Sequence, residues 1–245
     1  MPTNADAPEA SDRAWQGRTV LLSGATGAVG ARLLDHLVAA GARVGVAVRH
    51  RRHVAGLEAR LAAVPHLVAA VGTDDAEAAA GLVKGVEDSL GPIDAFLSTA
   101  GAFEAAPVGR ERAGTAERLL AANFLSVATL TRAVVPPMTR RGTGGLVFTG
   151  AAAVGVAGAG MALYCASKGA LHEYARCLAV ELAPAGIAVT VIAPRTIDTE
   201  ANRAAMPDVD RSDWVPVDTV VRALLTAARR TPDPEPALRV LKGGA

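Results

Sequence analysis

A tyrosine and a lysine lie four residues apart in the segment Tyr164-Cys165-Ala166-Ser167-Lys168. On a helix, residues at this spacing share one face and lie about one turn apart. An ammonium group close to a phenol lowers the phenol pKa and lets the hydroxyl exchange a proton near neutral pH. The pair therefore predicts general acid–base chemistry with Tyr164 as the proton donor. A chance pairing on a helix surface is the alternative, and Tyr174 has no lysine at this spacing.

Three glycines at intervals of three residues occur in the run Ser23-Gly24-Ala25-Thr26-Gly27-Ala28-Val29-Gly30. The run follows the apolar strand candidate Thr19–Ser23 and precedes an apolar-periodic helix over about 29–40. Glycines at such a junction allow a tight turn and close approach to a pyrophosphate, which the free N–H groups of the helix N-terminus bind. An ordinary turn in a chain rich in alanine and glycine is the alternative. The dinucleotide-binding residues predicted from this run are Gly24, Thr26, Gly27, Ala28, Val29 and Gly30.

The end of the second strand candidate, Arg43–Val48, bears on which dinucleotide is bound. A carboxylate there would accept hydrogen bonds from the adenosine ribose of NAD. The sequence instead continues Arg49-His50-Arg51-Arg52-His53, without a carboxylate. Arg49, with Arg51 or Arg52, could pair with the 2′-phosphate of NADP, so NADP(H) is favoured over NAD(H). A solvated basic start of the next helix is the alternative.

Strand and helix candidates alternate along the chain. Further strands are expected over about 67–71, 93–98, 145–149 and 188–192, and further helices over about 54–63, 76–90, 115–139 and 161–182. This alternation predicts a single α/β domain over residues 17–245, with a Rossmann-type, doubly wound parallel sheet of about seven strands and helices on both faces. The irregular stretch over 194–216 is long for a connector and predicts a substrate loop.

Composition limits the other possibilities. The net charge of +1 with 20% charged residues predicts neither nucleic-acid binding nor attraction to an anionic membrane. Glycine, proline or charged residues interrupt every apolar run short of a membrane span. Residues 1–16 are expected to form a disordered lead-in. Cys165 and Cys177 fall on one expected helix about 18 Å apart, beyond disulfide reach, which favours a reduced, cytoplasmic protein. The five histidines show no metal-ligand spacing, so no metal site is expected.

In the order and separation of these motifs, residues from about Gly17 to Val240 resemble the short-chain dehydrogenase/reductase family. Ser98-Thr99-Ala100-Gly101 resembles the family's turn after the fourth strand, and Asn123 matches an asparagine of the following long helix. The resemblance implies that Tyr164 donates a proton to the substrate as hydride arrives, and that Lys168 holds the nicotinamide ribose. It also implies that Asn123 anchors a water in the proton path. Further cofactor contacts that it implies come from Thr99, Ala100, Gly101, Pro194, Ile197 and Thr199.

The sequence also departs from the family pattern. Ala151 stands where the family usually has a serine, thirteen residues before the tyrosine. Thr149 lies two residues upstream and could face the same way on a strand, which makes it the candidate substitute. Loss of one donor to a developing oxyanion typically lowers the rate on the order of 100- to 1,000-fold, so an easily reduced substrate is expected. Ser98 and Thr99 replace asparagines usual in the family, and Arg195 replaces a glycine.

One branch of the family shares the absent serine. Thr149-Gly150-Ala151 and Gly160-Met161 are similar to segments of dihydropteridine reductases, as is the spacing of residues over 198–216. This resemblance implies a quinonoid dihydropterin, which accepts hydride readily. Those enzymes generally favour NADH, with an acidic residue where this chain has Arg49. Met206 and Trp214 in the expected substrate loop either line an apolar or aromatic pocket or anchor the loop.

These observations favour an NAD(P)H-dependent short-chain oxidoreductase acting on a small carbonyl, imine or quinonoid substrate. Two alternatives stay open: a dinucleotide-binding sensor or regulatory partner without redox turnover, and a redox-neutral enzyme using the same pocket. The helices around Asn123 and Tyr164 are rich in alanine, which suits close packing of a second subunit. The resemblance implies a homodimer or homotetramer.

Overall fold

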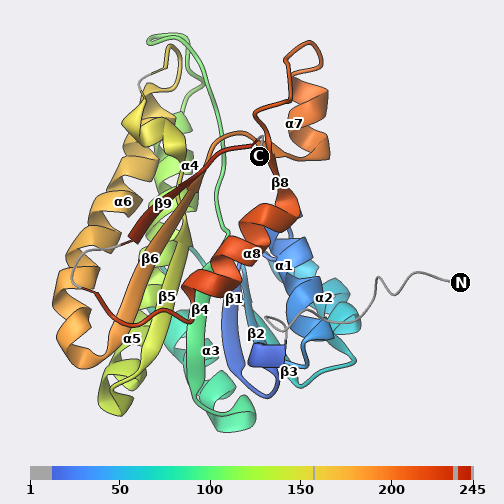
Figure 1. Cartoon of the computed structure of the whole chain (residues 1–245), viewed down its shortest axis with the longest axis vertical. Helices are drawn as coiled ribbons and strands as arrows, with labels where there is room; N and C mark the ends of the chain where they lie inside the picture. The colour runs from blue at the N-terminus through green and yellow to red at the C-terminus, as the bar shows by residue number, and fades with distance from the viewer. Residues whose placement is uncertain (1–12, 157, 234–236, 244–245) are drawn as a thin grey trace, which may run out of the picture.

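The computed structural model describes residues 13–156, 158–233 and 237–243. Seven parallel strands form one sheet in the order β3-β2-β1-β4-β5-β6-β9 (Figure 1). The strands are β1 (Thr19–Ser23), β2 (Arg43–Val48), β3 (His66–Ala70), β4 (Ile93–Ser98), β5 (Gly144–Thr149), β6 (Ile187–Pro194) and β9 (Ala237–Leu241). The predicted α/β fold with a doubly wound parallel sheet is confirmed.

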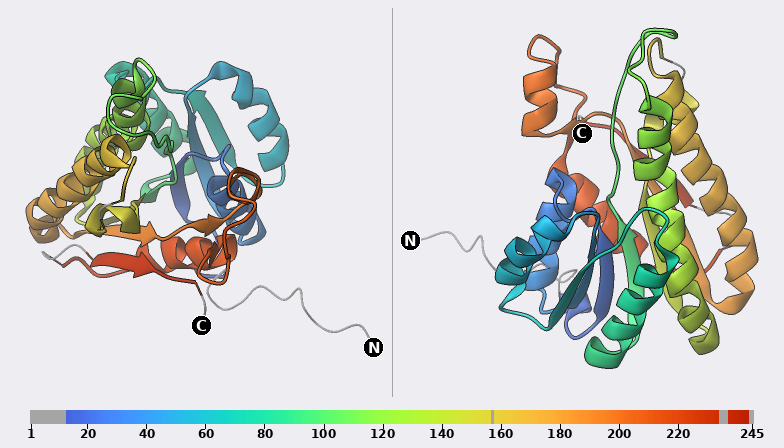
Figure 2. Two further views of the ribbon diagram at one scale, coloured as in Figure 1. Left: turned by 90° about the horizontal axis from the view of Figure 1, so that it is seen from above. Right: turned by 180° about the vertical axis from the view of Figure 1, so that it is seen from behind.

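Helices cover both faces of the sheet (Figure 2). One face packs against α1 (Ala28–Ala39), α2 (Val54–Leu61) and α8 (Val217–Ala227). The other packs against α3 (Ala76–Leu90), α5 (Ser126–Arg141) and α6 (Ala162–Leu182). Successive side chains of a strand point to opposite faces, so Leu97 of β4 joins the first core and Phe96 joins the second. Both cores are apolar, which explains why the strands are apolar nearly throughout.

The predicted long helix over 115–139 is continuous from Thr115 to Arg141, but it is not uniform. It consists of α4 (Thr115–Leu120), a π-helical turn at Ala121–Leu125 and α5. By length and mean hydropathy this helix could cross a membrane, which the interrupted apolar runs did not suggest. It packs against α3 and α6 within the domain, and its buried side supplies part of the core. The π turn contains Asn123, and such turns occur often at functional sites.

The structure differs from the predictions for residues 1–16 and for residues 194–216. Residues 1–12 of the expected lead-in lie outside the described residues, whereas Arg13–Trp15 forms a 3-10 turn. Trp15 is 1% exposed and joins the core beside α1, so the predicted lead-in is too long. The stretch over 194–216 is not irregular, because it contains β7 (Ile197–Asp198), α7 (Glu200–Ala205) and β8 (Val215–Pro216). Neither α8 nor β9 was predicted from the sequence.

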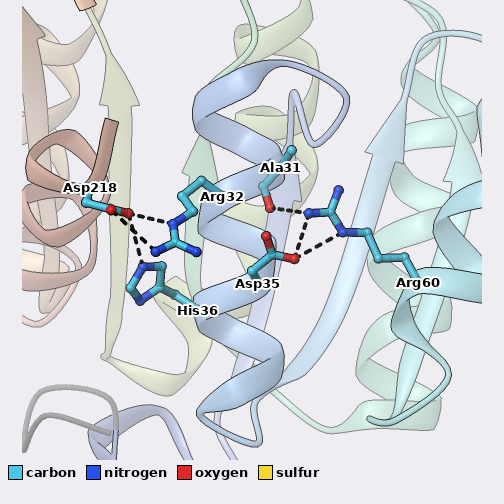
Figure 3. A network of polar contacts seen from close by, with 6 residues as sticks. All are labelled: Ala31, Arg32, Asp35, His36, Arg60 and Asp218. Carbon is cyan, nitrogen blue, oxygen red and sulfur yellow. Dashed lines mark hydrogen bonds and ion pairs between the residues drawn. The ribbon is translucent and has the colours of Figure 1, made fainter. Parts of the chain in front are cut away.

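Ion pairs on the outer surface join α1 to its two neighbouring helices (Figure 3). Arg32 of α1 binds Asp218 of α8 at 2.6 Å, and His36 lies 3.5 Å from the same carboxylate. On the other side, Arg60 of α2 binds Asp35 of α1 at 2.6 Å. These pairs are partly exposed, so each stabilises the fold by no more than about 1 kcal/mol. Their arrangement aligns the helix that follows the glycine-rich turn.

Candidate active site

The carboxyl ends of β1 and β4 are neighbours in the sheet, and the strand order reverses between them. In open α/β sheets this reversal leaves a crevice in which ligands bind. Ser23 ends β1 and donates through its hydroxyl to Ser98 Oγ at the end of β4, over 2.8 Å. Both the N–H and the hydroxyl of Thr99 donate to the Ser23 carbonyl, at 2.9 and 3.0 Å. The two residues that replace asparagines therefore close the floor of the crevice.

The glycine-rich turn packs directly against the turn after β4. Gly24 has a φ of +83°, and a Cβ there would lie 2.4 Å from the backbone nitrogen of Ala100. A Cβ on Gly30 would lie 2.1 Å from the Gly24 carbonyl oxygen. Side chains are therefore excluded at both positions, and at Gly24, which lines the crevice, the surface is formed by the backbone itself.

A groove of about 310 Å³ runs along this surface. Seven of the predicted cofactor-binding residues line it: Gly24, Thr26, Gly27, Arg49, Thr99, Ala100 and Gly101. Arg52 also lines the groove and Arg51 does not, which separates the two alternatives left open by the sequence. The lining holds basic side chains from 49–53 and no carboxylate among the described residues. A backbone cradle at a helix N-terminus, with arginines at its outer end, fits a phosphorylated dinucleotide.

Other predicted residues lie outside this lining. Gly30 is buried behind the turn, and Pro194 is buried at the end of β6. Thr199 accepts a hydrogen bond from Asn202 N at 3.2 Å and so caps α7. Trp214 is 6% exposed, with the Arg211 guanidinium 5.8 Å from the centre of its ring, while Met206 ends α7. Arg195 pairs with Asp213 at 3.2 Å across the same segment. Ala28 and Val29, in the first turn of α1, and Ile197, in β7, complete this set.

A chain of hydrogen bonds links the π turn to α6. Asn123 pairs with the backbone of Ala102, its Oδ1 accepting from the amide at 2.8 Å and its Nδ2 donating to the carbonyl at 3.0 Å. The same Nδ2 donates to Ser167 Oγ at 2.9 Å, and Ser167 donates to the Tyr164 carbonyl at 2.8 Å. Lys168 Nζ donates to the Thr149 carbonyl at 2.8 Å. Residues far apart in sequence are thus held in one polar cluster.

Gly101 joins this cluster to the groove. It lines the groove, and a Cβ added to it would lie 2.9 Å from Asn123 Oδ1 and 3.1 Å from Lys168 Nζ. The turn after β4 therefore has the groove on one side and the amide and ammonium groups on the other. Gly101 thus lies between the groove and two of the predicted residues, Asn123 and Lys168.

Burial shifts the pKa values of both members of the Tyr164/Lys168 pair. It raises the pKa of Tyr164 to about 12, with a further contribution from Cys165, and lowers the pKa of Lys168 to about 8. Burial disfavours the charged form of each group, which explains the opposite directions. In the cofactor-free protein, burial therefore places the pKa of Tyr164 above its usual value rather than below it, where the Tyr164/Lys168 pairing had predicted it. Tyr164 is a neutral phenol at pH 7, as a proton donor must be.

The end of β5 is fastened to α6 by a histidine. The backbone N–H of Ala151 donates to His172 Nε2 at 3.2 Å. Burial, together with the charge of Lys168, lowers the pKa of His172 to about 4, so the ring is a neutral acceptor at pH 7. The hydroxyl of Thr149 is buried and has no hydrogen-bond partner among the described residues. This hydroxyl therefore has hydrogen-bonding capacity that no described residue uses.

An exposed aromatic ring lies beside the tyrosine. Phe103 contacts Tyr164 edge-to-face, with ring centroids 4.8 Å apart and planes at 77°. It is 60% exposed, although aromatic residues make up only 3% of the chain. The ring therefore presents an apolar face next to the phenol.

The family model for short chain dehydrogenases matches residues 18–210, which include the groove and the polar cluster. The chain belongs to the short-chain dehydrogenase family. Members of this family are oxidoreductases that use NAD(P) and act on small molecules, and this short-chain dehydrogenase has the seven-stranded parallel sheet of the family.

Curated relatives of this short-chain dehydrogenase carry different names. It is 27% identical over 194 residues to a 3-oxoacyl-[acyl-carrier-protein] reductase of Salmonella typhimurium, covering 79% of each chain. It is 32% identical over 160 residues to a protein named inactive 2-(S)-hydroxypropyl-CoM dehydrogenase 2, of Xanthobacter autotrophicus, covering 65% of this chain and 69% of that protein. A solved gluconate 5-dehydrogenase of Burkholderia cenocepacia, in complex with NADP and tartrate, aligns with a TM-score of 0.79 at 26% identity, covering 89% and 91% of the two chains.

Several residues of this short-chain dehydrogenase that contact the predicted ones were not themselves predicted. Ser167 lies within the segment Tyr164–Lys168, and its position on the shared helix was the available signal. His172 follows Lys168 by four residues, so the helical spacing that picked out the first pair would also have included it. Phe103 gave no such signal, because its neighbour Tyr164 is remote in sequence.

Proposed function

We propose that this chain is an NADPH-dependent reductase in which Tyr164 delivers a proton to the substrate. The observation that carries the proposal is the position of Gly101, which lines the dinucleotide groove and leaves no room for a Cβ beside Asn123 and Lys168, because it joins the groove to the acid–base cluster. Arg49 and Arg52 at the outer end of the groove support the choice of NADPH over NADH.

When bound, NADPH supplies the hydride. Tyr164, kept neutral by a pKa of about 12, donates its phenolic proton to the substrate oxygen or nitrogen. Lys168 contributes positive charge that stabilises the tyrosinate left behind, and the Thr149 carbonyl orients its Nζ. Asn123 and Ser167 hold the first turns of α6 against the turn after β4, so that phenol and groove keep their relative position. Asn123 is also the proposed anchor of a water in the proton path.

The substrate that we propose is easily reduced and planar. Ala151 offers no hydroxyl to a developing oxyanion, and Thr149 Oγ1, the candidate replacement, is buried in the cofactor-free protein. The exposed face of Phe103 next to Tyr164 suits a flat ring. A quinonoid dihydropterin is both easily reduced and planar. The similarity of the segment Thr149-Gly150-Ala151 to dihydropteridine reductases supports the same substrate. Activated carbonyls and imines are the wider class.

We propose a homodimer or homotetramer as the working assembly. The described residues of the helical layer around the π turn and α6 leave Leu120, Leu125 and Val180 exposed, and such side chains suit packing against a second subunit. Cys165 and Cys177 lie on the same helix, α6, and both are free, which suits the reducing compartment expected from the sequence.

A dinucleotide-binding protein without redox turnover is the second candidate. The alanine at position 151 favours it, and one relative at 32% identity is itself named inactive. Asn123, Tyr164 and Lys168 argue for turnover, because a pure binding protein would gain nothing from burying a lysine beside a phenol.

The deciding experiment measures binding and oxidation of NADPH and NADH, with a quinonoid dihydropterin and a panel of small ketones as acceptors. We expect NADPH oxidation that is lost in Tyr164→Phe, with nucleotide binding unchanged in that variant. Tyr174→Phe is the matched control and should retain activity. Tight NADPH binding without turnover on any acceptor would favour the second candidate. Failure to bind either nucleotide would rule out both.

A further inference from the structure

Two arginine–histidine pairs lie side by side at the outer end of the dinucleotide groove. Arg49 Nε donates to His50 Nε2 at 3.1 Å, and Arg52 Nε donates to His53 Nε2 at 3.3 Å. The two imidazole rings lie 6.3 Å apart, and all four side chains line the groove. Since each Nε2 accepts a hydrogen bond, neither ring carries a proton on that nitrogen.

This cluster has positive charge and, within the part of the chain that the structure describes, no counter-ion. Among the described residues, no ion pair involves Arg49 or Arg52. Burial lowers the pKa of His50, and the neighbouring charges of Arg49, Arg52 and His53 lower it further. Each of the two arginines thus donates to a neutral imidazole and not to a carboxylate, so their positive charges are left uncompensated. A cluster of this kind is suited to binding an anion.

The opposite side of the groove brings no charge of its own. It is formed by the turn after β1 and by Val71-Gly72-Thr73 after β3, all uncharged. Asp74 and Asp75 follow Thr73 outside the groove lining, and Asp75 accepts a hydrogen bond from Ala78 N, which caps α3. A dianion bound between the two pairs would therefore meet only cationic or neutral groups.

We propose that His50 and His53 complete a 2′-phosphate site with Arg49 and Arg52, and that NADPH binding takes up protons on the two imidazole rings. The inference rests on the proposed cofactor function of the groove. On binding, the arginine N–H groups exchange their histidine acceptors for phosphate oxygens. Each freed Nε2 then takes a proton from the buffer and becomes a cationic donor to the same phosphate, so that proton uptake accompanies the binding of the dianion.

The consequence is a cofactor preference that depends on pH. NADPH and NADH differ only in the 2′-phosphate, so the ratio of their dissociation constants isolates this site. Protonation of the rings becomes easier as pH falls from about 8 to about 6.5, and the preference for NADPH should increase over that range. Below about pH 6 the phosphate itself takes up a proton, and the increase should stop.

Calorimetric titration of the full chain with NADPH and with NADH, in buffers of different ionisation enthalpy, measures the protons taken up on binding. At pH 7 we expect NADPH to take up more protons than NADH, by up to about two protons, one for each ring. The double variant His50→Gln/His53→Gln should lose this difference and flatten the pH dependence of the NADPH/NADH affinity ratio. All four side chains are at least partly exposed, so thermal unfolding of the variants should match the unsubstituted chain.

Arginine variants provide the matched control. Arg52→Gln should weaken NADPH binding and leave NADH binding unchanged, whereas Arg51→Gln, outside the lining, should do neither. NADPH binding without extra proton uptake, or with uptake that persists in the double variant, would overturn the inference and leave the proposed reductase standing. Absence of binding of either nucleotide would instead overturn the proposed function, and this inference with it.

Discussion

The backbone N–H of Ala151 donates to His172 Nε2 over 3.2 Å, which ties the residue at the family's serine position to the helix that carries Tyr164. Tyr164, Lys168 and His172 recur at intervals of four residues along α6. The ring also fills the space beside Gly150, where a Cβ would lie 2.2 Å from its Nε2. The His172 ring thus fills the space next to the end of β5 and leaves no room for a side chain at position 150.

The buried ring makes stability sensitive to acid. The pKa of His172 is about 4 in the folded protein and near 6.5 in the unfolded chain, so between these values only the unfolded chain takes up the proton. Stability is therefore complete above about pH 6.5 and falls as the pH drops toward 4. After allowance for the partial exposure of the ring, the loss is roughly 2 kcal/mol. His172→Gln, which keeps an acceptor for Ala151, should flatten this fall in thermal unfolding between pH 7.5 and 4, whereas His66→Gln on β3 should not.

Lys168 should be required for turnover but should lower the free energy of unfolding of the cofactor-free protein. Burial lowers its pKa from 10.5 to about 8, so the unfolded chain binds the proton more tightly, and stability rises as the pH increases from about 8 to 10.5. At pH 7 the pKa shift corresponds to a cost in folding stability of about 3 kcal/mol, which removal of the ammonium group would recover. The same substitution removes the hydrogen bond to the Thr149 carbonyl, which lowers the gain by about 1 kcal/mol. Lys168→Met should abolish turnover and raise the melting temperature of the cofactor-free protein by a few degrees. Lys84→Met, at an exposed lysine, should change neither; a lower melting temperature for Lys168→Met would contradict the prediction.

Restoring the family's serine should widen the substrate range. Ala151→Ser places a hydroxyl where a developing oxyanion needs a donor, and we expect reduction of simple ketones to increase by an order of magnitude or more. Steady-state kinetics on a ketone and on a dihydropterin check this, and the gain should be larger for the ketone. In the unsubstituted background, Thr149→Val tests the alternative donor. A large loss of activity in Thr149→Val, with no gain in Ala151→Ser, would show that Thr149 already fills the role.

Gly101 should be intolerant of a single methyl group. An alanine Cβ would lie 2.9 Å from Asn123 Oδ1 and 3.1 Å from Lys168 Nζ, so either the polar cluster or the turn must move. Gly101→Ala should weaken NADPH binding and lower kcat together, on the order of 100-fold in kcat/KM, because a shift of about 1 Å in a reacting group has that effect. Gly81→Ala is the control, since no atom outside the helix lies within 4 Å of the added methyl. Fluorescence titration and initial rates separate the two effects.

Local pattern predicted much of the fold. The bounds of β1, β2, β4 and α3 agree with those expected from apolar runs and their flanking residues. The α3 helix illustrates the reason: Asp75 caps its first turn and Gly91 ends it with a φ of 92°, and both signals lie within a few residues. The segments that were missed, β7, β8 and β9, gain their stability from pairing with remote strands, which leaves little trace in their own sequence.

The amino-acid sequence by itself determined which side chains recur at helical and turn spacing: the Tyr164/Lys168 pair, the glycines from Gly24 to Gly30, and the basic segment after β2. These are short-range properties of the chain. Tertiary packing decided the rest, because burial and contact between remote residues do not depend on local pattern. It raised the pKa of Tyr164 and lowered that of Lys168, and it brought Gly101 against Asn123. It also turned Arg52 into the groove and left Arg51 outside its lining, although the two are adjacent in sequence.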